Sequence, residues 1–378
     1  MLGRQMTGAA TNSFQFLTKG TNEFVRIDHA LIAELVAGRI LSREDSDVVD
    51  QFNVQLTVSP QAWTPFEWSP QEDNFFSIAP RDQWLDYLIY RYKMRVYPEK
   101  KIVSDFPVYV LVEPTSICNL RCTMCFQVDQ SFTRKPFMGM MDIDLYKRVI
   151  DELVAGGTRA LTLASRGEPT LHPKLGEMLR YAGGKFLDLK LNTNATRMTE
   201  QLCRDIIESG VTELVFSIDS HEKVIYEKIR VRGKFDEVLE GVMLFKAIRD
   251  SYGQIATHTR VSGVKFRPDQ NTQGFLDFWS QHVDHVGYVD IEERWDTYNN
   301  VLHSDKTHPC NYLWERIYVW FDGIVNVCDV DYKSLLSTGN VKDSTIRDVW
   351  HGALYTKLRE DHLNKQRALH SPCDRCNV

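Results

Sequence analysis

Two periodicities of apolar residues alternate along the middle of the chain. Short apolar runs predict strands at 108–114, 160–165, 187–194, 213–219, 258–266 and 286–291. Between them, apolar residues on a helical period predict helices at 142–157, 173–184, 199–210, 235–250 and 272–282. Strands that alternate with helices form a parallel sheet with right-handed crossovers, and eight such units close a barrel. The six strands therefore predict an α/β fold, an open and partial (β/α)6 barrel at residues 106–292.

The chain on either side lacks this alternation. Residues 1–105 form an N-terminal extension with a predicted helix at 28–42 and an aromatic stretch at 62–92. These aromatic residues either pack on the next domain or form a lid that recognises substrate.

Residues 293–378 are predicted to form a smaller α+β domain. Alternating apolar runs at 314–330 surround Asp322-Gly323, a dipeptide typical of hairpin turns. A helix is predicted at 346–364.

Composition and charge narrow the class of protein. The chain has 378 residues, 43% of them hydrophobic, a net charge of −6 and a pI near 6.0. This balance gives no basic face for nucleic acid. No run reaches the roughly 18 apolar residues of a membrane span, and the N-terminus lacks the apolar segment of a secretory signal. We therefore expect a cytoplasmic protein, in which clustered cysteines are metal ligands or catalysts.

Three of the eight cysteines follow the first predicted strand directly. Cys118, Cys122 and Cys125 lie in CNLRCTMC, with C-x3-C-x2-C spacing. Loops after the strands of a parallel barrel carry its sites, and iron–sulfur clusters are held by cysteine thiolates, usually four. Three thiolates leave either a ligand from elsewhere or one open iron. The alternative is a zinc knuckle or chance clustering.

This loop resembles the hallmark of the radical SAM enzymes. The resemblance implies a [4Fe–4S] cluster on the three cysteines, whose open iron binds the amino and carboxylate groups of S-adenosylmethionine (SAM). Reductive cleavage of SAM would give a 5′-deoxyadenosyl radical, with a flavodoxin- or ferredoxin-type protein as electron donor. The residue before the third cysteine is usually aromatic in this family. Here it is Met124, whose backbone is expected near adenine, and Phe126 is expected to supply aromatic cover.

Motifs after the next strands resemble the same family. SRGEPTLHP at 165–173 is similar to its Gly-Gly-Glu-Pro motif, which implies that Glu168 meets the SAM ammonium. Arg166 replaces the first glycine and is expected either to reach a substrate or to pair with an acid. The resemblance further implies SAM contacts at Asn192, Asn194, Ser217 and Arg260, with Asp219 as a further candidate. The alternatives are ordinary turn polar residues for the two asparagines and a solvated strand residue for Arg260. Tyr226, Arg230 and Arg232 are expected either to face the substrate or to shape a loop.

Four more cysteines follow the predicted barrel: Cys310, Cys328, Cys373 and Cys376. They resemble the SPASM/twitch extension of radical SAM enzymes, in its shorter form with one auxiliary [4Fe–4S] cluster. Four thiolates would leave no iron open to substrate, and a four-thiolate zinc site is the alternative. Cys203 lies at an apolar position of a predicted helix and is expected to be a buried hydrophobe.

A closed second cluster favours net oxidation, because it can accept an electron from a substrate radical. Candidate bases for the accompanying proton are Asp329 and Glu293, with Asp331 and Asp296 nearby. The resemblance implies dehydrogenation of a sugar- or aminocyclitol-like alcohol. The alternatives are a peptide-modifying enzyme, a redox-neutral epimerase and a non-catalytic electron-transfer or zinc-binding scaffold.

Overall fold

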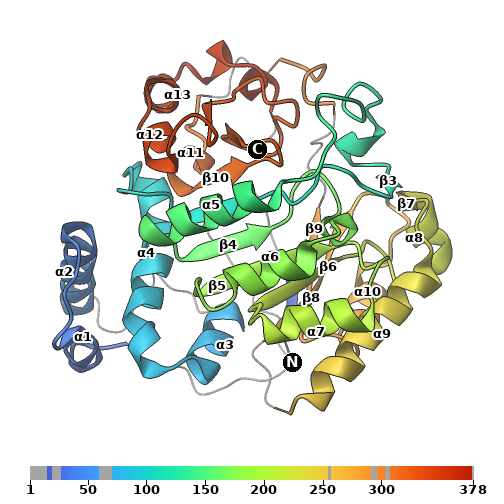
Figure 1. Ribbon diagram of the computed structural model, residues 1–378, viewed down its shortest axis with the longest axis horizontal. Coiled ribbons are helices and arrows are strands. Elements are labelled where there is room, and N and C mark those ends of the chain that lie inside the picture. Colours follow the sequence, from blue (N-terminus) through green and yellow to red (C-terminus); the bar gives the residue numbers. More distant parts are fainter. Residues whose placement is uncertain are drawn as a thin grey trace.

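The computed structural model describes residues 15–18, 27–58, 70–253, 257–290, 296–302 and 307–376 (Figure 1). Ten strands form one sheet in the order β1-β9-β8-β6-β5-β4-β2-β10-β11-β12. Their bounds are β1 Gln15–Thr18, β2 Tyr109–Val112, β4 Ala160–Leu163, β5 Asp188–Thr193, β6 Glu213–Ser217, β8 His258–Lys265, β9 His285–Asp290, β10 Arg316–Val319, β11 Ile324–Asn326 and β12 Gly339–Asn340. A separate two-stranded sheet joins β3 (Arg121–Cys122) to β7 (Arg230–Val231).

The central strands are parallel, as the alternation of strands and helices predicts. The pairs β2–β4, β4–β5, β5–β6, β6–β8 and β8–β9 are all parallel. The α/β class and the six barrel strands are therefore confirmed. The sequence did not predict the pairing at one end of the sheet. There β10 of the C-terminal hairpin pairs parallel with β2 and extends the same sheet. At the other end, β1 pairs antiparallel with β9.

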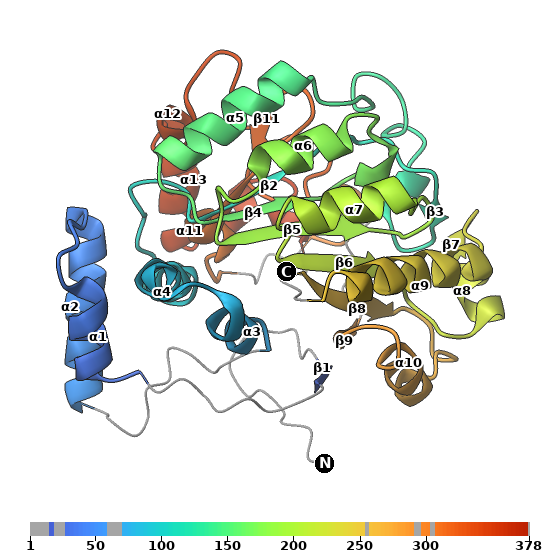
Figure 2. The ribbon, with the colours of Figure 1, turned by 60° about the horizontal axis from the view of Figure 1, so that its bottom comes forward.

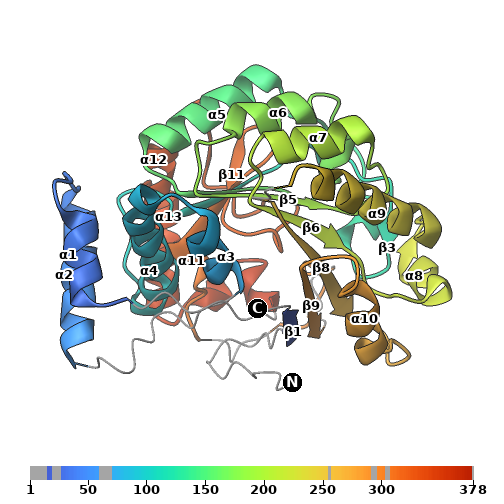
Figure 3. The same cartoon turned by 90° about the horizontal axis from the view of Figure 1, so that it is seen from below.

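Helices cover one face of this sheet in an arc (Figure 3). They are α5 Ile143–Ala155, α6 Leu175–Ala182, α7 Glu200–Glu208, α8 Lys223–Ile229, α9 Phe235–Ser251 and α10 Thr272–Trp279. Side-chain caps fix their first turns, since Asp142, Thr199 and Asn271 each accept a backbone N–H at the start of α5, α7 and α10. Their apolar faces share one core with alternate strand residues such as Leu161, Leu189 and Leu214.

The residues between those alternate positions point to the other, concave face of the sheet, because successive strand side chains face opposite sides. This concave face is polar along the central strands. It carries Thr162, Lys190, Asn192, Glu213 and Arg260.

The N-terminal extension is helical, with α1 His29–Val36, α2 Arg43–Val58, α3 Pro70–Ile78 and α4 Trp84–Lys100. The helix expected at 28–42 ends early, because Gly38 takes a φ of 73°. The four helices share a second apolar core that reaches Val108 and Ala160 at the amino ends of two strands. Tyr90 donates to Asp188 across 3.2 Å, so α4 packs on the barrel end opposite the cysteine loop (Figure 2). Of the aromatic stretch, residues 59–69 lie outside the described residues.

The C-terminal region contains α11 Tyr312–Glu315, α12 Ile346–Trp350 and α13 Ala353–Leu363. The hairpin is confirmed, and Gly323 in its turn has a φ of 87°. The prediction of a single helix at 346–364 is wrong, because the helix is interrupted at Gly352. A Cβ at this position would lie 2.7 Å from the Asp348 carbonyl oxygen. Short 3-10 turns occur at Arg81–Gln83, Phe126–Val128, Pro169–Leu171, Arg367–Leu369 and Cys373–Arg375.

Candidate active site at the carboxyl ends of the strands

The three-cysteine loop leaves β2 and folds over the carboxyl end of the sheet. Cys122 is buried, while Cys118 and Cys125 are half-buried. Burial raises the pKa of Cys118 to about 11 and that of Cys125 to about 12, and the charges of neighbouring cysteines act in the same direction. Three thiols that oppose one another's ionisation need a cation to hold them as thiolates. This donor set fits an iron–sulfur cluster, whose ligands are cysteine thiolates.

The RGEP segment lies against this loop, backbone to backbone. The Glu168 amide donates to the Ile117 carbonyl oxygen at 2.9 Å. A Cβ on Gly167 would lie 2.2 Å from the Thr115 carbonyl oxygen, so a side chain at this position has no room. The Gln127 amide closes the contact, because it donates to the carbonyl oxygens of Ser116 and Arg166. The glycine of the motif is thus required by a close approach of two loops.

Glu168 is buried and fixed by four hydrogen bonds. Its Oε1 accepts from the Thr170 amide and hydroxyl and from the Thr193 hydroxyl, while Oε2 accepts from the Asn194 amide at 2.6 Å. Burial raises the pKa of this carboxyl, and the four hydrogen bonds oppose that rise. The loop after β4 therefore presents Glu168 as a preoriented acceptor close to Cys118, held by residues at the end of β5. Its contact with the SAM ammonium stays a prediction.

The two asparagines after β5 differ in their surroundings. Asn194 donates to the Asn119 side chain at 2.9 Å and accepts from Thr196, so it ties this turn to the cysteine loop. The Asn192 Oδ1 is buried without a hydrogen-bond partner on the concave face. Ser217 lies half-buried at the end of β6. Asn192 and Ser217 remain available to a ligand.

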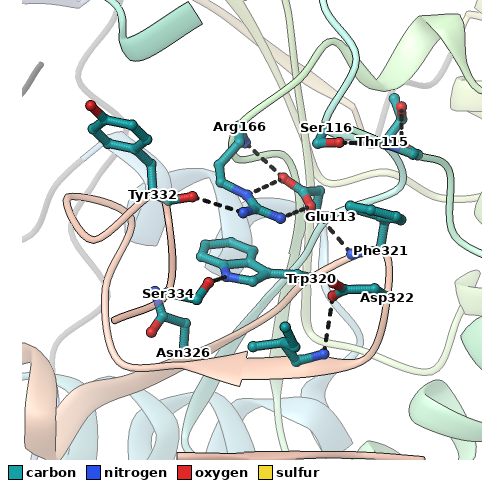
Figure 4. A network of polar contacts seen from close by, with 12 residues as sticks. Glu113, Thr115, Ser116, Arg166, Trp320, Phe321, Asp322, Asn326, Tyr332 and Ser334 are labelled. Carbon is teal, nitrogen blue, oxygen red and sulfur yellow. Dashed lines mark hydrogen bonds and ion pairs between the residues drawn. The ribbon is translucent and has the colours of Figure 1, made fainter. Parts of the chain in front are cut away.

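Arg166 is not placed to meet a substrate. Its guanidinium is buried and forms a two-pronged ion pair with Glu113, at 2.8 and 2.6 Å (Figure 4). It also donates to the Tyr332 carbonyl oxygen at 2.9 Å and lies 4.2 Å from the centre of the Trp320 ring. Of the two roles expected for Arg166, pairing with an acid is the one that these contacts support. Arg166 joins the barrel to the C-terminal region.

Arg260 lies toward the amino end of β8 and is engaged by an acidic residue, and its contact with SAM stays a prediction. It pairs with Val215 near the start of β8, whereas the cysteine loop lies beyond the strand ends. Its Nε is 3.0 Å from a Glu213 oxygen, and Lys190 lies 2.6 Å from the same carboxylate. Burial tends to raise the pKa of Glu213, but the two cations overcome it and hold the value at about 2. Arg260 is thus part of a concave-face charge cluster deeper in the barrel.

Phe126 packs toward the C-terminal region. Its ring stacks on Tyr332, with centroids 4.9 Å apart, and meets Phe132 edge to face. The Phe126 ring, expected to cover SAM, thus packs against other protein side chains. Met124 is half-buried.

The four C-terminal cysteines line one pocket. Cys310, Cys328, Cys373 and Cys376 come from three separate segments and converge there. The rest of the lining is mainly apolar, with Leu313, Val327, Val330 and Leu336, and also includes Asp331, His362 and Arg367. Burial raises the pKa of Cys328, and the other three thiols add to the rise. Four thiols in an apolar pocket fit a closed cluster as ligands. Cys203 is buried in the helix–sheet core, as expected.

The candidate bases separate into different roles. Asp331 is fully buried and saturated by the Tyr298 hydroxyl and the amides of Leu335 and Leu336. Asp329 is half-buried next to Cys328, and the Tyr318 hydroxyl donates to it at 3.4 Å. Glu293 lies outside the described residues.

Several residues that hold this site escaped the sequence analysis. Glu113 anchors Arg166, and Asn119, Thr170 and Thr193 orient the loops. The available signal for Glu113 was an acidic residue directly after an apolar strand and shortly before the cysteine loop. The others look like ordinary turn polar residues.

Family comparisons agree with this arrangement. A model described as the radical SAM superfamily matches residues 112–270, and one described as the SPASM iron–sulfur cluster-binding domain matches residues 310–377. A tungsten-containing aldehyde ferredoxin oxidoreductase cofactor-modifying protein of Pyrococcus furiosus is 34% identical over 112 residues, 29% of this chain and 30% of that protein. The mycofactocin maturase MftC of Mycobacterium tuberculosis is 29% identical over 132 residues, 35% of this chain and 32% of that protein. The chain thus spans about a third or less of these relatives.

Solved structures show the same fold. Streptococcus suis SuiB bound to S-adenosylmethionine superposes with a TM-score of 0.54 at 13% identity, covering 90% of this chain and 87% of that one. SuiB has also been solved with its precursor peptide SuiA, with a TM-score of 0.52. The chain thus contains a radical SAM domain at residues 112–270 and a SPASM iron–sulfur cluster-binding domain at residues 310–377. Among the described residues, no helix has the length and apolar character needed to cross a membrane.

Proposed function

We propose that this protein is a radical SAM oxidoreductase that removes two electrons from its substrate. The observation that carries the proposal is the convergence of four cysteines on one apolar pocket. A cluster with four protein ligands has no open iron for substrate, so its suitable role is electron transfer. Three cysteines hold the SAM-binding cluster and four hold the auxiliary one, with a flavodoxin- or ferredoxin-type donor supplying electrons.

The bound cluster and SAM would supply a 5′-deoxyadenosyl radical that takes hydrogen from a C–H bond. The protein's own residues orient SAM and shield it. Glu168, fixed by Thr193 and Asn194, accepts from the SAM ammonium. Asn192 and Ser217 offer polar groups at the carboxyl end of the sheet.

We propose a sugar- or aminocyclitol-like alcohol as substrate. The concave face presents hydroxyl, amide and charged side chains along β4, β5, β6 and β8, whereas the interior of a packed barrel is usually filled by branched apolar residues. Such a lining suits a polyhydroxylated molecule. Oxidation to a ketone removes a hydrogen atom from carbon, a proton from oxygen and one further electron. Asp329 takes the proton, and the auxiliary site takes the electron.

A peptide is the alternative substrate. The relative named mycofactocin maturase shares 29% identity over 132 residues, which favours this class. The alcohol-oxidising and the peptide-modifying function share the step that generates the radical. They differ in the product that is formed.

The test is an anaerobic assay of the reconstituted protein with SAM, a chemical reductant and matched panels of cyclitols, amino sugars and peptides. We expect one alcohol, deuterated at its carbinol carbon, to deliver deuterium to 5′-deoxyadenosine and to form a ketone two mass units lighter than the unlabelled alcohol. A product of unchanged mass would indicate an epimerase instead. Turnover with peptides alone would replace the alcohol by the alternative, and failure to cleave SAM would refute both.

A further inference from the structure

A two-stranded sheet places an arginine directly opposite a cluster cysteine. In the β3–β7 pair, Cys122 is the register partner of Arg230, and the Thr123 amide donates to the Ile229 carbonyl oxygen at 2.9 Å. Side chains of directly opposed residues in an antiparallel pair lie on the same face. The Arg230 guanidinium accordingly interacts with the Cys122 sulfur.

Arg230 is held in this position by a buried carboxylate. Its Nε lies 2.5 Å from one Asp219 oxygen, and the other oxygen accepts from the Val264 amide at 2.9 Å. The Gln270 side chain donates to the Asp219 carbonyl oxygen at 2.7 Å. Asp219 is fully buried and Arg230 is 9% exposed. The ion pair is therefore rigid and shielded from water, which strengthens its field.

The two charges act on Cys122 with opposite signs. Arg230 is the register partner of Cys122, and Asp219 holds the guanidinium through its Nε. A thiolate at Cys122 would thus lie beside the positive charge of Arg230, with the negative charge of Asp219 behind the guanidinium. Positive charge and hydrogen bonds at a cluster's sulfur ligands make the cluster easier to reduce.

We propose that Arg230 is a positioning residue that sets the reduction potential of the three-cysteine cluster through Cys122, with Asp219 holding the guanidinium in place and partly screening it. The inference rests on the proposed cluster at Cys118, Cys122 and Cys125. It is independent of the substrate and of net oxidation.

The test is a potentiometric titration of the reconstituted protein, followed by electron paramagnetic resonance. The cluster whose signal changes on SAM addition is the three-cysteine one. Arg230→Gln should move its potential to a lower value, because the positive charge is lost. Asp219→Asn should move it to a higher value, because the guanidinium loses its counter-charge.

Opposite shifts distinguish this role from a structural one. Both variants break the same ion pair, so mere loss of structure would move the potential in one direction for both. Arg249→Gln is the matched control, since the buried Arg249 pairs with the half-buried Asp284 in another part of the barrel. In Arg249→Gln the potential of the three-cysteine cluster should stay unchanged. The potential of the auxiliary cluster should stay unchanged in every variant.

Two results would overturn the proposal: equal potentials in all variants, or shifts of the same sign for Arg230→Gln and Asp219→Asn. If either variant fails to bind iron, Arg230→Lys provides the second reading. It keeps the charge and should leave the potential near that of the parent. A failure of alcohol oxidation in the parent protein would leave these potentials measurable, so the two proposals fail separately.

Discussion

Individual residues of the site are placed by loops rather than by their own strands. Glu168 owes its orientation to Thr170 in its own loop and to Thr193 and Asn194 at the end of β5. Gly167 allows that arrangement because it leaves room for the Thr115 carbonyl oxygen. Changes at this scale should therefore affect ligand binding more than overall folding.

Replacing Glu168 by glutamine should weaken SAM binding by about tenfold or more, the equivalent of ~1.4 kcal/mol. The change removes the negative charge and turns one oxygen into a donor that faces the Thr193 hydroxyl or the Asn194 amide. Equilibrium binding of SAM to reconstituted protein measures the effect. Glu177→Gln on exposed α6 is the control. Unchanged affinity in Glu168→Gln with normal iron content would contradict the assigned contact.

Three segments meet at one buried ion pair. Glu113 ends β2, Arg166 follows β4, and the pair reaches the backbone of Phe321 and Tyr332 in the C-terminal region (Figure 4). Since both side chains are nearly inaccessible, each charge depends on the other for compensation.

Removing one partner of this pair should cost about 3–5 kcal/mol of unfolding free energy. We expect this for Glu113→Gln and for Arg166→Met, measured by urea denaturation under anaerobic conditions. The double variant Glu113→Leu, Arg166→Met should be less destabilised than either single variant, because no buried charge remains unpaired. Lys147→Gln, which breaks an exposed pair with Glu177, should change stability by under about 1 kcal/mol. A double variant as unstable as the sum of both singles would argue against coupling.

At the scale of the whole molecule, two cysteine sites share one sheet. Because β10 pairs with β2, the strand that leads into the three-cysteine loop is bonded to the hairpin that carries Cys328. The SPASM domain therefore continues the barrel sheet instead of standing apart from it.

This arrangement predicts a division of labour between the sites. Cys118→Ala should abolish reductive cleavage of SAM. Cys373→Ala should keep a measurable fraction of cleavage but lose the oxidised product. Chromatography of 5′-deoxyadenosine and of product measures both, and Cys203→Ala, a core cysteine, is the control. Equal loss of cleavage in the first two variants would contradict separate roles.

The pH dependence of stability also belongs to this scale. Burial and the neighbouring His258 lower the pKa of His285 to about 4, and the two rings are hydrogen-bonded at 3.0 Å. The unfolded value is about 6.5, so the unfolded state binds the proton first as pH falls. Stability is then lost between pH 6.5 and 4, by about 2 kcal/mol at pH 5 from this group. Denaturation curves at pH 7.5 and 5 should show the loss, and His285→Gln should reduce it.

Much of the fold follows from local patterns. The strands and capped helices at 142–253 and 257–290 obey apolar periodicity and cap chemistry, which depend only on nearby residues. The spacing of Cys118, Cys122 and Cys125 likewise predicted a ligand set, because a short loop brings its thiols together. The four C-terminal cysteines lie far apart in the sequence and were grouped by resemblance to a known family. Local patterns do not predict the partner of Arg260. Its ion pair with Glu213 depends on its position along the strand rather than on its residue type.

The sequence by itself determined the α/β class and the three-cysteine loop, since both are encoded in local spacing along the chain, and its motifs carried the resemblance to the radical SAM family. Only the tertiary structure decided that Arg166 pairs with Glu113, that β10 extends the barrel sheet and that Arg230 faces Cys122. Each of these contacts joins residues far apart in sequence. Their energies depend on burial and on the position of a distant partner, which no local pattern of residues contains.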